Sequence, residues 1–405
     1  MPIRKLKVKK ETRVDKIKSR KGFGRSKSTE LTERGSSKHI GDTAQVSLPC
    51  VSQSRRATNP SAARQKEIEK VTSLSFIPVL DKNGKTLMPC TPARVRELLC
   101  SGRAKAQHYK GIFYVQVDRD GGSVQSISLG IDPGSKREAF TAKSKHHTYI
   151  NVLANAVTWV KDSVEVKRNM RRARRFRKTP CRKNKYNRCS SPFPPSTKSR
   201  WQNKLRIVKF LMKLYPITSF VVEDISAITK KNCKKWNKSF SPLEVGKTWF
   251  YGELEKLGKL EIRTGYETKE ERDKLGLKKT KSKLENVFSA HNVDSWVLAN
   301  SHVGGHILPD NMTMIRMIPL QFSRRQLHRL QCSSGGIRTR YGGTKSGKFT
   351  RGMLVQHSKY GLCYVGGHMD KTGTSLHNLC EGKRLCQNAK DKDISVMCYS
   401  SWRIY

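Results

Sequence analysis

Acidic residues are scarce in this sequence, and long apolar runs are absent from it. Of 405 residues, 82 are Lys or Arg and 32 are Asp or Glu, which gives a formal net charge of +50 at pH 7. No stretch is apolar for long enough to span a membrane, and we find no cleavable apolar signal segment. We therefore expect no membrane partner. A charge of this size predicts a polyanion as partner, and nucleic acid is the natural candidate.

Closely paired cysteines are missing as well. The chain has 11 cysteines but no C-x-x-C pair, and the nearest neighbours are Cys181 with Cys189 and Cys380 with Cys386. Structural zinc sites and disulfide frameworks usually show paired spacings. We expect reduced, dispersed thiols, while a structural zinc ion assembled from distant cysteines stays open.

Residues 1–73 are basic, rich in Ser and without hydrophobic periodicity. This composition predicts a disordered or loosely helical arm that can lie along phosphates. An organelle transit peptide is the alternative, and it is weakened by Glu11, Asp15, Glu30 and Glu33, because such peptides are poor in acids.

Residues 74–120 are expected to form a small folded unit. Asn83-Gly84 predicts a tight turn after a short strand, and Thr91 followed by Pro92 predicts the start of a helix. A further strand is expected at residues 111–117. The unit is too small for a large core of its own, so we expect it to dock on another part of the protein.

The stretch LGIDPGSK places a single acid at the end of an apolar run. Alternation from Ile127 to Ile131 predicts a half-buried strand, with Asp132 on the face opposite its apolar side chains. Pro133-Gly134 then forces a turn. Taken alone, Asp132 is better explained as a turn-initiating residue that hydrogen-bonds its own backbone.

Two later segments carry further acids. The run ITSFVVED predicts a buried strand with Glu223 and Asp224 at its carboxyl end, and because the apolar run is continuous, alternation does not tell which acid faces a site. The run FSAHNVDSWVLANS predicts a helix in which His291 and Asp294 share one face. Caps, turns or a surface pair would account for each of these residues separately.

The densest positive run lies within residues 161–192 and contains RRARRFRK. At helical spacing Val166, Met170 and Ala173 form only a narrow apolar stripe. Few acids balance the charge, and arginine favours bidentate contact to phosphate. The pattern predicts a nucleic-acid-binding helix, with a solvated surface helix as the alternative. The candidate contact residues are Arg171, Arg172, Arg174 and Arg175.

The segment from 321 to 405 is rich in Gly, Arg and short β-prone runs, which predicts a small sheet or barrel with basic loops. Three aromatic residues capable of stacking stand among its cations, although core packing is the commoner role for each: Tyr341, Phe349 and Tyr360. Arg338, Arg340 and Lys345 are the candidates for reading a groove of duplex DNA, and contact to phosphate alone is the alternative.

A set of three carboxylates from separate elements is what two-metal phosphodiester hydrolysis needs. Asp132, Glu223 and Asp294 would hold two divalent ions, one activating water and one stabilising the leaving oxygen. Oxygen ligands favour Mg²⁺ or Mn²⁺ over zinc. His291 could serve as general base for the water, since the unperturbed pKa of histidine lies near neutrality.

GIDPGSK, VVED and HNVDSWVLA together resemble the three split RuvC motifs of the transposon-encoded IscB/IsrB proteins, relatives of CRISPR effector nucleases. LDKNGKTLMPCTPARVRELL resembles their N-terminal PLMP domain, with Thr86 in place of the motif's first proline. RRARRFRK is similar to their bridge helix, and GGIRTRYGGT is similar to their C-terminal region. The resemblance extends from about Leu74 to the end of the sequence.

This resemblance implies an α/β protein with an RNase H-like (RuvC) split domain, an arginine-rich bridge helix, a small N-terminal PLMP unit and a small β-rich C-terminal domain. The implied order is a basic arm at 1–73, the PLMP-like domain at 74–120, the first RuvC segment at 121–160, the bridge helix at 161–192, the second and third RuvC segments at 193–320, and a domain that contacts the target-adjacent motif at 321–405.

The resemblance also assigns roles to residues. The family's metal-binding acids fall on Asp132, Glu223 and Asp294, and its catalytic histidine falls on His291, whereas Asp224 matches no catalytic position. The implied metal is Mg²⁺ or Mn²⁺, as two ions.

One departure from the IscB pattern affects the expected activity. IscB proteins carry an HNH nuclease between the second and third RuvC motifs, but the stretch from Ile228 to Ala290 is too short for one and contains no histidine. GYETKEERDKLGLKKTK resembles the shorter IsrB branch, which has RuvC alone. One active centre implies that one strand is cut.

The expected function is therefore RNA-guided nicking of target double-stranded DNA. The protein would act as a monomer in a ribonucleoprotein with a structured guide RNA, in a prokaryotic cytoplasm or, if organelle-encoded, in the stroma or matrix. Three alternatives remain: a nuclease-inactive guide-RNA/DNA-binding protein, a structural RNA-binding or nucleoid protein, and the related TnpB class. TnpB proteins carry a zinc ribbon of paired C-x-x-C, which this sequence lacks.

Overall fold

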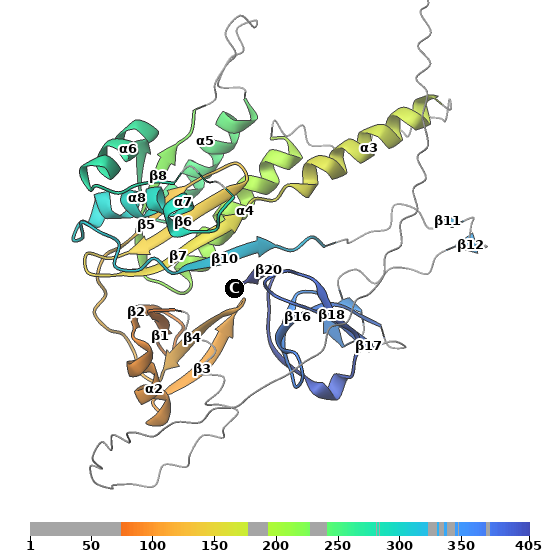
Figure 1. Cartoon of the computed structure of the whole chain (residues 1–405), viewed down its shortest axis with the longest axis horizontal. Helices are drawn as coiled ribbons and strands as arrows, with labels where there is room; N and C mark the ends of the chain where they lie inside the picture. The colour runs from red at the N-terminus through yellow and green to blue at the C-terminus, as the bar shows by residue number, and fades with distance from the viewer. Residues whose placement is uncertain are drawn as a thin grey trace, which may run out of the picture. The chain divides into compact units, whose positions relative to one another are not determined.

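The computed structural model describes residues 74–176, 193–226, 241–280, 282, 284–322, 330–331, 336–337, 345–346, 348–369 and 373–405. The basic arm expected at 1–73 lies outside these residues, as do Arg338, Arg340 and Tyr341. The described chain is a mixed α/β protein, as expected, with sheets of seven, five and four strands and two sheets of two strands (Figure 1). No described helix is long and apolar enough to cross a membrane.

The seven-stranded sheet has the order β20-β10-β7-β6-β5-β8-β9. Antiparallel pairing joins β5 to β6 and β6 to β7, whereas β8 runs parallel to β5 and β9 runs parallel to β8. Because β5 and β8 are parallel neighbours, their carboxyl ends lie at the same edge of the sheet. The bounds are β5 Ile127–Asp132, β6 Arg137–Lys143, β7 Thr148–Asn155, β8 Ile217–Asp224, β9 Lys259–Thr264, β10 Met314–Pro319 and β20 Trp402–Ile404.

Strand β5 is buried on both faces, so the expectation of a half-buried strand was wrong. All residues from Ile127 to Ile131 are buried. The alternating apolar side chains pack in a core that includes helix α4 (Pro195–Met212), whereas Gly130 faces helix α8 (Val293–Val303). A Cβ atom at Gly130 would lie 1.9 Å from the backbone oxygen of Ser295. Glycine therefore lets α8 cross the strand at backbone contact.

Three further helices belong to this region: α5 (Pro242–Glu255), α6 (Gly265–Lys274) and the single-turn α7 (Phe288–His291). Helix α5 packs on α4 through Gly246, where a Cβ atom would lie 1.9 Å from Nε1 of Trp201. Helix α6 follows β9 directly and contacts α8. In the part that the structure describes, the stretch between the second and third acidic segments therefore contains α5, β9 and α6.

The arginine-rich segment forms helix α3 (Trp159–Phe176), which confirms the expected helix as far as residue 176. Residues 177–192, the rest of the expected bridge helix, lie outside the described residues. The narrow apolar stripe of α3 is not fully buried, since Val166 is 53% exposed.

The unit that begins at residue 74 contains a four-stranded sheet and one helix. Its strands have the order β2-β1-β4-β3. Gly84 adopts φ +80° in the turn before β2, and Thr91 caps the helix by accepting a hydrogen bond from the backbone N–H of Arg94. Both features were expected. The bounds are β1 Ile77–Leu80, β2 Thr86–Cys90, α2 Pro92–Cys100, β3 Ala104–Tyr109 and β4 Ile112–Val117.

The described part of the C-terminal segment is mostly β-strand, as its composition predicts, and the strands of its largest sheet pair antiparallel. The five-stranded sheet has the order β18-β17-β16-β15-β19, and Phe349 is buried in its core. The last strand, β20, pairs with β10 of the seven-stranded sheet. The bounds are β11 Leu330–Gln331, β12 Gly336–Ile337, β13 Lys345–Ser346, β14 Phe349–Thr350, β15 Met353–His357, β16 Gly361–Met369, β17 Gly373–His377, β18 Arg384–Ala389, the 3-10 helix η3 Asp391–Asp393 and β19 Ile394–Tyr399.

Candidate metal centre

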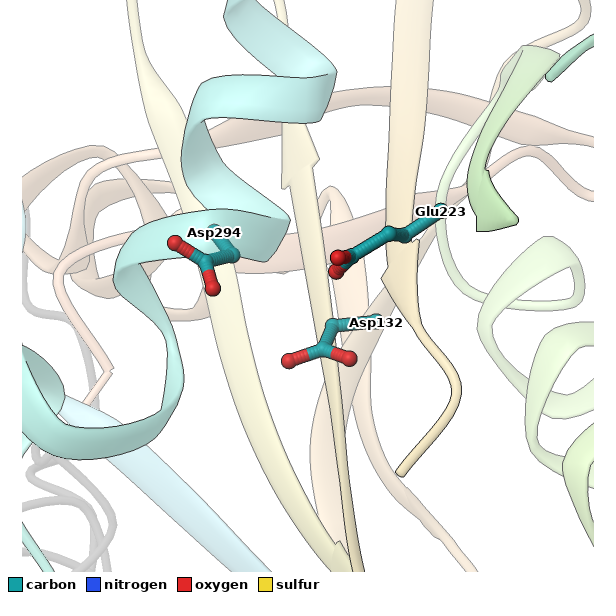
Figure 2. A group of neighbouring side chains, drawn as sticks. All are labelled: Asp132, Glu223 and Asp294. Atoms are coloured by element: carbon teal, nitrogen blue, oxygen red, sulfur yellow. The ribbon is translucent and has the colours of Figure 1, made fainter. Parts of the chain in front are cut away.

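Three carboxylates from three elements meet at one edge of the seven-stranded sheet (Figure 2). Asp132 ends β5, Glu223 lies at the carboxyl end of β8, and Asp294 lies in the first turn of α8. One ligand oxygen from each acid lies within 4.8 Å of the others. The parallel pairing of β5 with β8 brings the first two together, and the close crossing of α8 over β5 adds the third.

The structure separates the two acids at the end of β8. Glu223 joins the cluster. Asp224 points to helix α5 instead, where its Oδ1 accepts hydrogen bonds from the Tyr251 hydroxyl at 3.1 Å and from Lys247 Nζ at 2.9 Å. Asp224 is thus a partner of α5, and Glu223 is the acid on the side of the cluster.

Burial makes the cluster costly to ionise. Burial raises the pKa of Asp132 to about 6, and the Asp294 carboxylate adds to this rise while Lys279 opposes it. Burial also raises the pKa of Glu223 to about 7, with Asp132 and Asp294 adding to it. Desolvated carboxylates that repel one another favour either a proton or a cation between them.

Two cations contact Asp294. Arg272 Nη1 donates a hydrogen bond to its Oδ1 at 2.8 Å, and Lys279 Nζ donates one to its Oδ2. Arg272 belongs to α6, and Lys279 lies in the segment that follows this helix. Sequence reasoning missed both residues, because they stand in a stretch with many other cations and no pattern singles them out.

His291 is not part of the 4.8 Å group. Its Nε2 lies 2.6 Å from Arg137 Nη1 and 3.0 Å from the backbone oxygen of Glu285. Nε2 accepts from Arg137 in one tautomer and donates to Glu285 in the other, because arginine can only donate and a carbonyl oxygen can only accept. Burial, followed by the charge of Arg137, lowers the pKa of His291. The expectation of one continuous helix was also wrong, because α7 ends at His291 and α8 begins at Val293, with Asn292 between them.

A buried ion pair supports the turn that follows Asp132. Lys204 Nζ of α4 lies 2.5 Å from Glu138 Oε1 of β6 and donates to the backbone oxygen of Gly134 at 3.3 Å. The side chains of Lys204 and Glu138 are 4% and 0% exposed. The pair therefore ties α4 to both ends of the turn between β5 and β6.

The residues present fit a hard divalent cation. The three acids offer only oxygen ligands, their burial and mutual repulsion raise the pKa of Asp132 and of Glu223, and one oxygen from each is within 4.8 Å of the others. Mg²⁺ and Mn²⁺ prefer such ligands. No cysteine or histidine belongs to this group, so the group does not have the ligand types of a structural zinc site.

The expected nucleic-acid residues are only partly described. Arg171, Arg172 and Arg175 are exposed on α3, and Arg174 belongs to the same helix. Lys345 lies in β13, whereas Arg338 and Arg340 lie outside the described residues.

Comparisons with known proteins give a match to one family model and likenesses to solved structures. Residues 77–238 match the sequence model of a family described as RRXRR protein, and residues 171–175 read RRARR, the pattern that this name spells. The matched range includes Asp132, Glu223 and helix α3. Among solved structures, one likeness is to "T. thermophilus RuvC in complex with Holliday junction substrate", at 12% identity, 45% of this chain, 98% of that chain and a TM-score of 0.24. No curated protein matches.

Proposed function

We propose that the protein is a metal-dependent DNA endonuclease that is guided by RNA and cuts one strand of its target. The convergence of Asp132, Glu223 and Asp294 at one sheet edge carries this proposal. Their donor set suits Mg²⁺ or Mn²⁺, and the charge of +50 suits a polyanionic guide and target. The resemblance to IsrB proteins supports the choice of RNA-guided DNA cleavage among metal-dependent reactions.

In this mechanism the three carboxylates bind and position the metal, which would lower the pKa of a water and stabilise the leaving oxygen. Asp132 and Glu223 are anchored on adjacent strands, and Asp294 is anchored on a helix that touches β5 at Gly130. The lowered pKa of His291 keeps its imidazole neutral near pH 7, the form that accepts a proton. Its use as general base through Nε2 requires this atom to leave both Arg137 and the backbone oxygen of Glu285.

We assign the finer fold and the partners in the same proposal. The strands β7-β6-β5-β8-β9, with acids at the ends of β5 and β8, support an RNase H-like (RuvC) split domain. The exposed arginines of α3 support a bridge helix that grips the guide RNA. The residues from 74 to 120 would form the PLMP-like domain, and those from 321 onward would contact duplex DNA beside the target.

A cleavage assay on an end-labelled target duplex tests the proposal. The guide is found by sequencing the RNA that co-purifies with the protein. Cleavage should require Mg²⁺ or Mn²⁺ and should be lost in Asp132→Asn, Glu223→Gln and Asp294→Asn, while target binding remains, because affinity rests on distributed cationic contacts. Asp224→Asn is the matched control and should retain most activity, since Asp224 contacts α5.

Two outcomes would contradict the assignment. Essential Asp224 with dispensable Glu223 would show that the wrong acid of β8 has been chosen. Target binding without cleavage under any divalent ion would favour the nuclease-inactive guide-RNA/DNA-binding protein.

A further inference from the structure

Lys279 places an ammonium group inside the acid cluster. Its Nζ donates to Oδ2 of Asp294, while Arg272 Nη1 donates to Oδ1 of the same carboxylate at 2.8 Å. The Asp294 side chain is only 7% exposed, and that of Lys279 is 33% exposed. Both oxygens of this acid therefore already have a cationic partner in a largely water-excluded site.

The charge of Lys279 acts on all three acids. Burial lowers the pKa of Lys279, but Asp294, followed by Asp132 and Glu223, raises it above its ordinary value overall. In return, the lysine opposes the rise in the pKa of Asp132 and of Glu223. The ammonium is thus a counter-cation for the whole cluster.

We propose that Lys279 is an internal competitor of the divalent ion and sets the metal affinity of the centre. This inference rests on the proposed metal site. An ammonium and a divalent ion in contact with one carboxylate repel each other at close range. Asp294 therefore ligates the ion only when Lys279 withdraws from Oδ2.

When a metal ion binds, Lys279 leaves the Asp294 carboxylate and Arg272 remains hydrogen-bonded to it. Arg272 is part of helix α6 and its side chain is 15% exposed. Lys279 lies beyond the end of α6, is more exposed and reaches Asp294 through a four-carbon stem. Metal occupancy is thereby coupled to the withdrawal of the Lys279 side chain from Asp294.

Mn²⁺ binding to the full-length protein tests this inference without any need for activity. The protein is freed of nucleic acid by high-salt chromatography, free Mn²⁺ is followed by its EPR signal, and Asp294→Asn reports ions bound elsewhere. Lys279→Met should lower the Kd of the Asp294-dependent site by about tenfold, which corresponds to about 1.4 kcal/mol. Lys279→Gln should change the Kd in the same direction.

Two variants serve as matched controls. Lys279→Arg keeps the charge and should bind Mn²⁺ much as the wild type does. Lys278→Met removes the same charge from the neighbouring exposed position and should change the Kd far less. Thermal unfolding gives a second readout. Without Mn²⁺, Lys279→Met should have a lower melting temperature than the wild type. The same concentration of Mn²⁺ should raise the melting temperature of Lys279→Met by more than it raises that of the wild type.

The outcomes separate this inference from the proposed function. Equal Kd values for the wild type, Lys279→Met and Lys278→Met would overturn the competitor role and leave the metal centre intact. Absence of Asp294-dependent binding from every variant would overturn the metal centre, and the inference with it.

Discussion

At the scale of single residues, the geometry of Asp132 depends on a buried ion pair that the strand itself does not contain. Lys204 reaches from α4 to Glu138 and to the backbone of the Asp132 turn. Burial raises the pKa of Glu138, and Lys204 opposes that rise. Removing one partner of such a pair leaves the other as an uncompensated buried charge, which is much costlier than replacing both.

We therefore predict that Lys204→Met lowers the free energy of unfolding by about 3–5 kcal/mol. The double variant Lys204→Met/Glu138→Leu should recover most of this loss, because no buried charge is left. Chemical denaturation of the full chain at neutral pH measures both values.

Lys198→Met on the same helix is the control, and as an exposed position it should change stability by no more than about 0.5 kcal/mol. If the double variant is as unstable as Lys204→Met, the unpaired charge of Glu138 does not cause the lower free energy of unfolding. The cause is then the lost packing of the Lys204 stem.

The sequence predicted the acids of the cluster, but not their surroundings. Asp132 and Asp294 follow from their motifs, and the family resemblance favoured Glu223 over Asp224, which strand alternation did not separate. The physical reason for that choice is visible only in the structure, where Lys247 and Tyr251 of α5 are the partners of Asp224. The arginine on His291 lies 154 residues away along the chain, and the lysine on Asp294 lies 15 residues away, beyond the reach of helical or strand spacing. Such pairings depend on tertiary packing, which residue spacing in the sequence does not predict.

At the scale of elements, α3 carries the prediction about guide binding. Its exposed arginines have few acids to neutralise them, and each phosphate contact releases counterions. Replacing Arg171, Arg172, Arg174 and Arg175 with Gln should weaken RNA binding and reduce the slope of log K against log salt by about one unit per lost contact. Titration of the guide RNA at several salt concentrations measures this slope.

Replacing the same four residues with Lys keeps the charge and is the control. The slope should then stay near that of the wild type, while affinity falls to the extent that bidentate contacts matter. A slope that the Gln variant leaves unchanged would mean that α3 is a solvated surface helix.

Helices α5 and α6 have helix-start patterns in their sequences but little hydrophobic periodicity. Both lie in a charged stretch with little apolar periodicity, so neither was expected. Each nevertheless begins with the helix-start pattern S/T-x-x-E: Ser241 accepts from the backbone N–H of Glu244, and Thr264 forms a capping box with Glu267. Capping signals therefore locate these helices where hydrophobic patterning fails.

At the scale of the whole molecule, the mixed α/β class and the β-rich C-terminal segment followed from composition and pattern, but the sheet order did not. Strand β20 pairs with β10 across a long stretch of chain, and Trp402 donates to Oδ1 of Asn203 on α4 at 3.2 Å. A contact between residues so far apart is set by how the elements pack, not by local propensity. The C-terminal end is thus built into the sheet that carries the acids.

The number of strands cut tests the central claim most directly. One acid cluster of this kind is found in the described residues, and one centre should cut one strand. Supercoiled target plasmid, incubated with the ribonucleoprotein and Mg²⁺, should accumulate as open circles with no linear form at early times, and Asp132→Asn should abolish the product. Early linear product, or nicking that survives Asp132→Asn, would contradict the account.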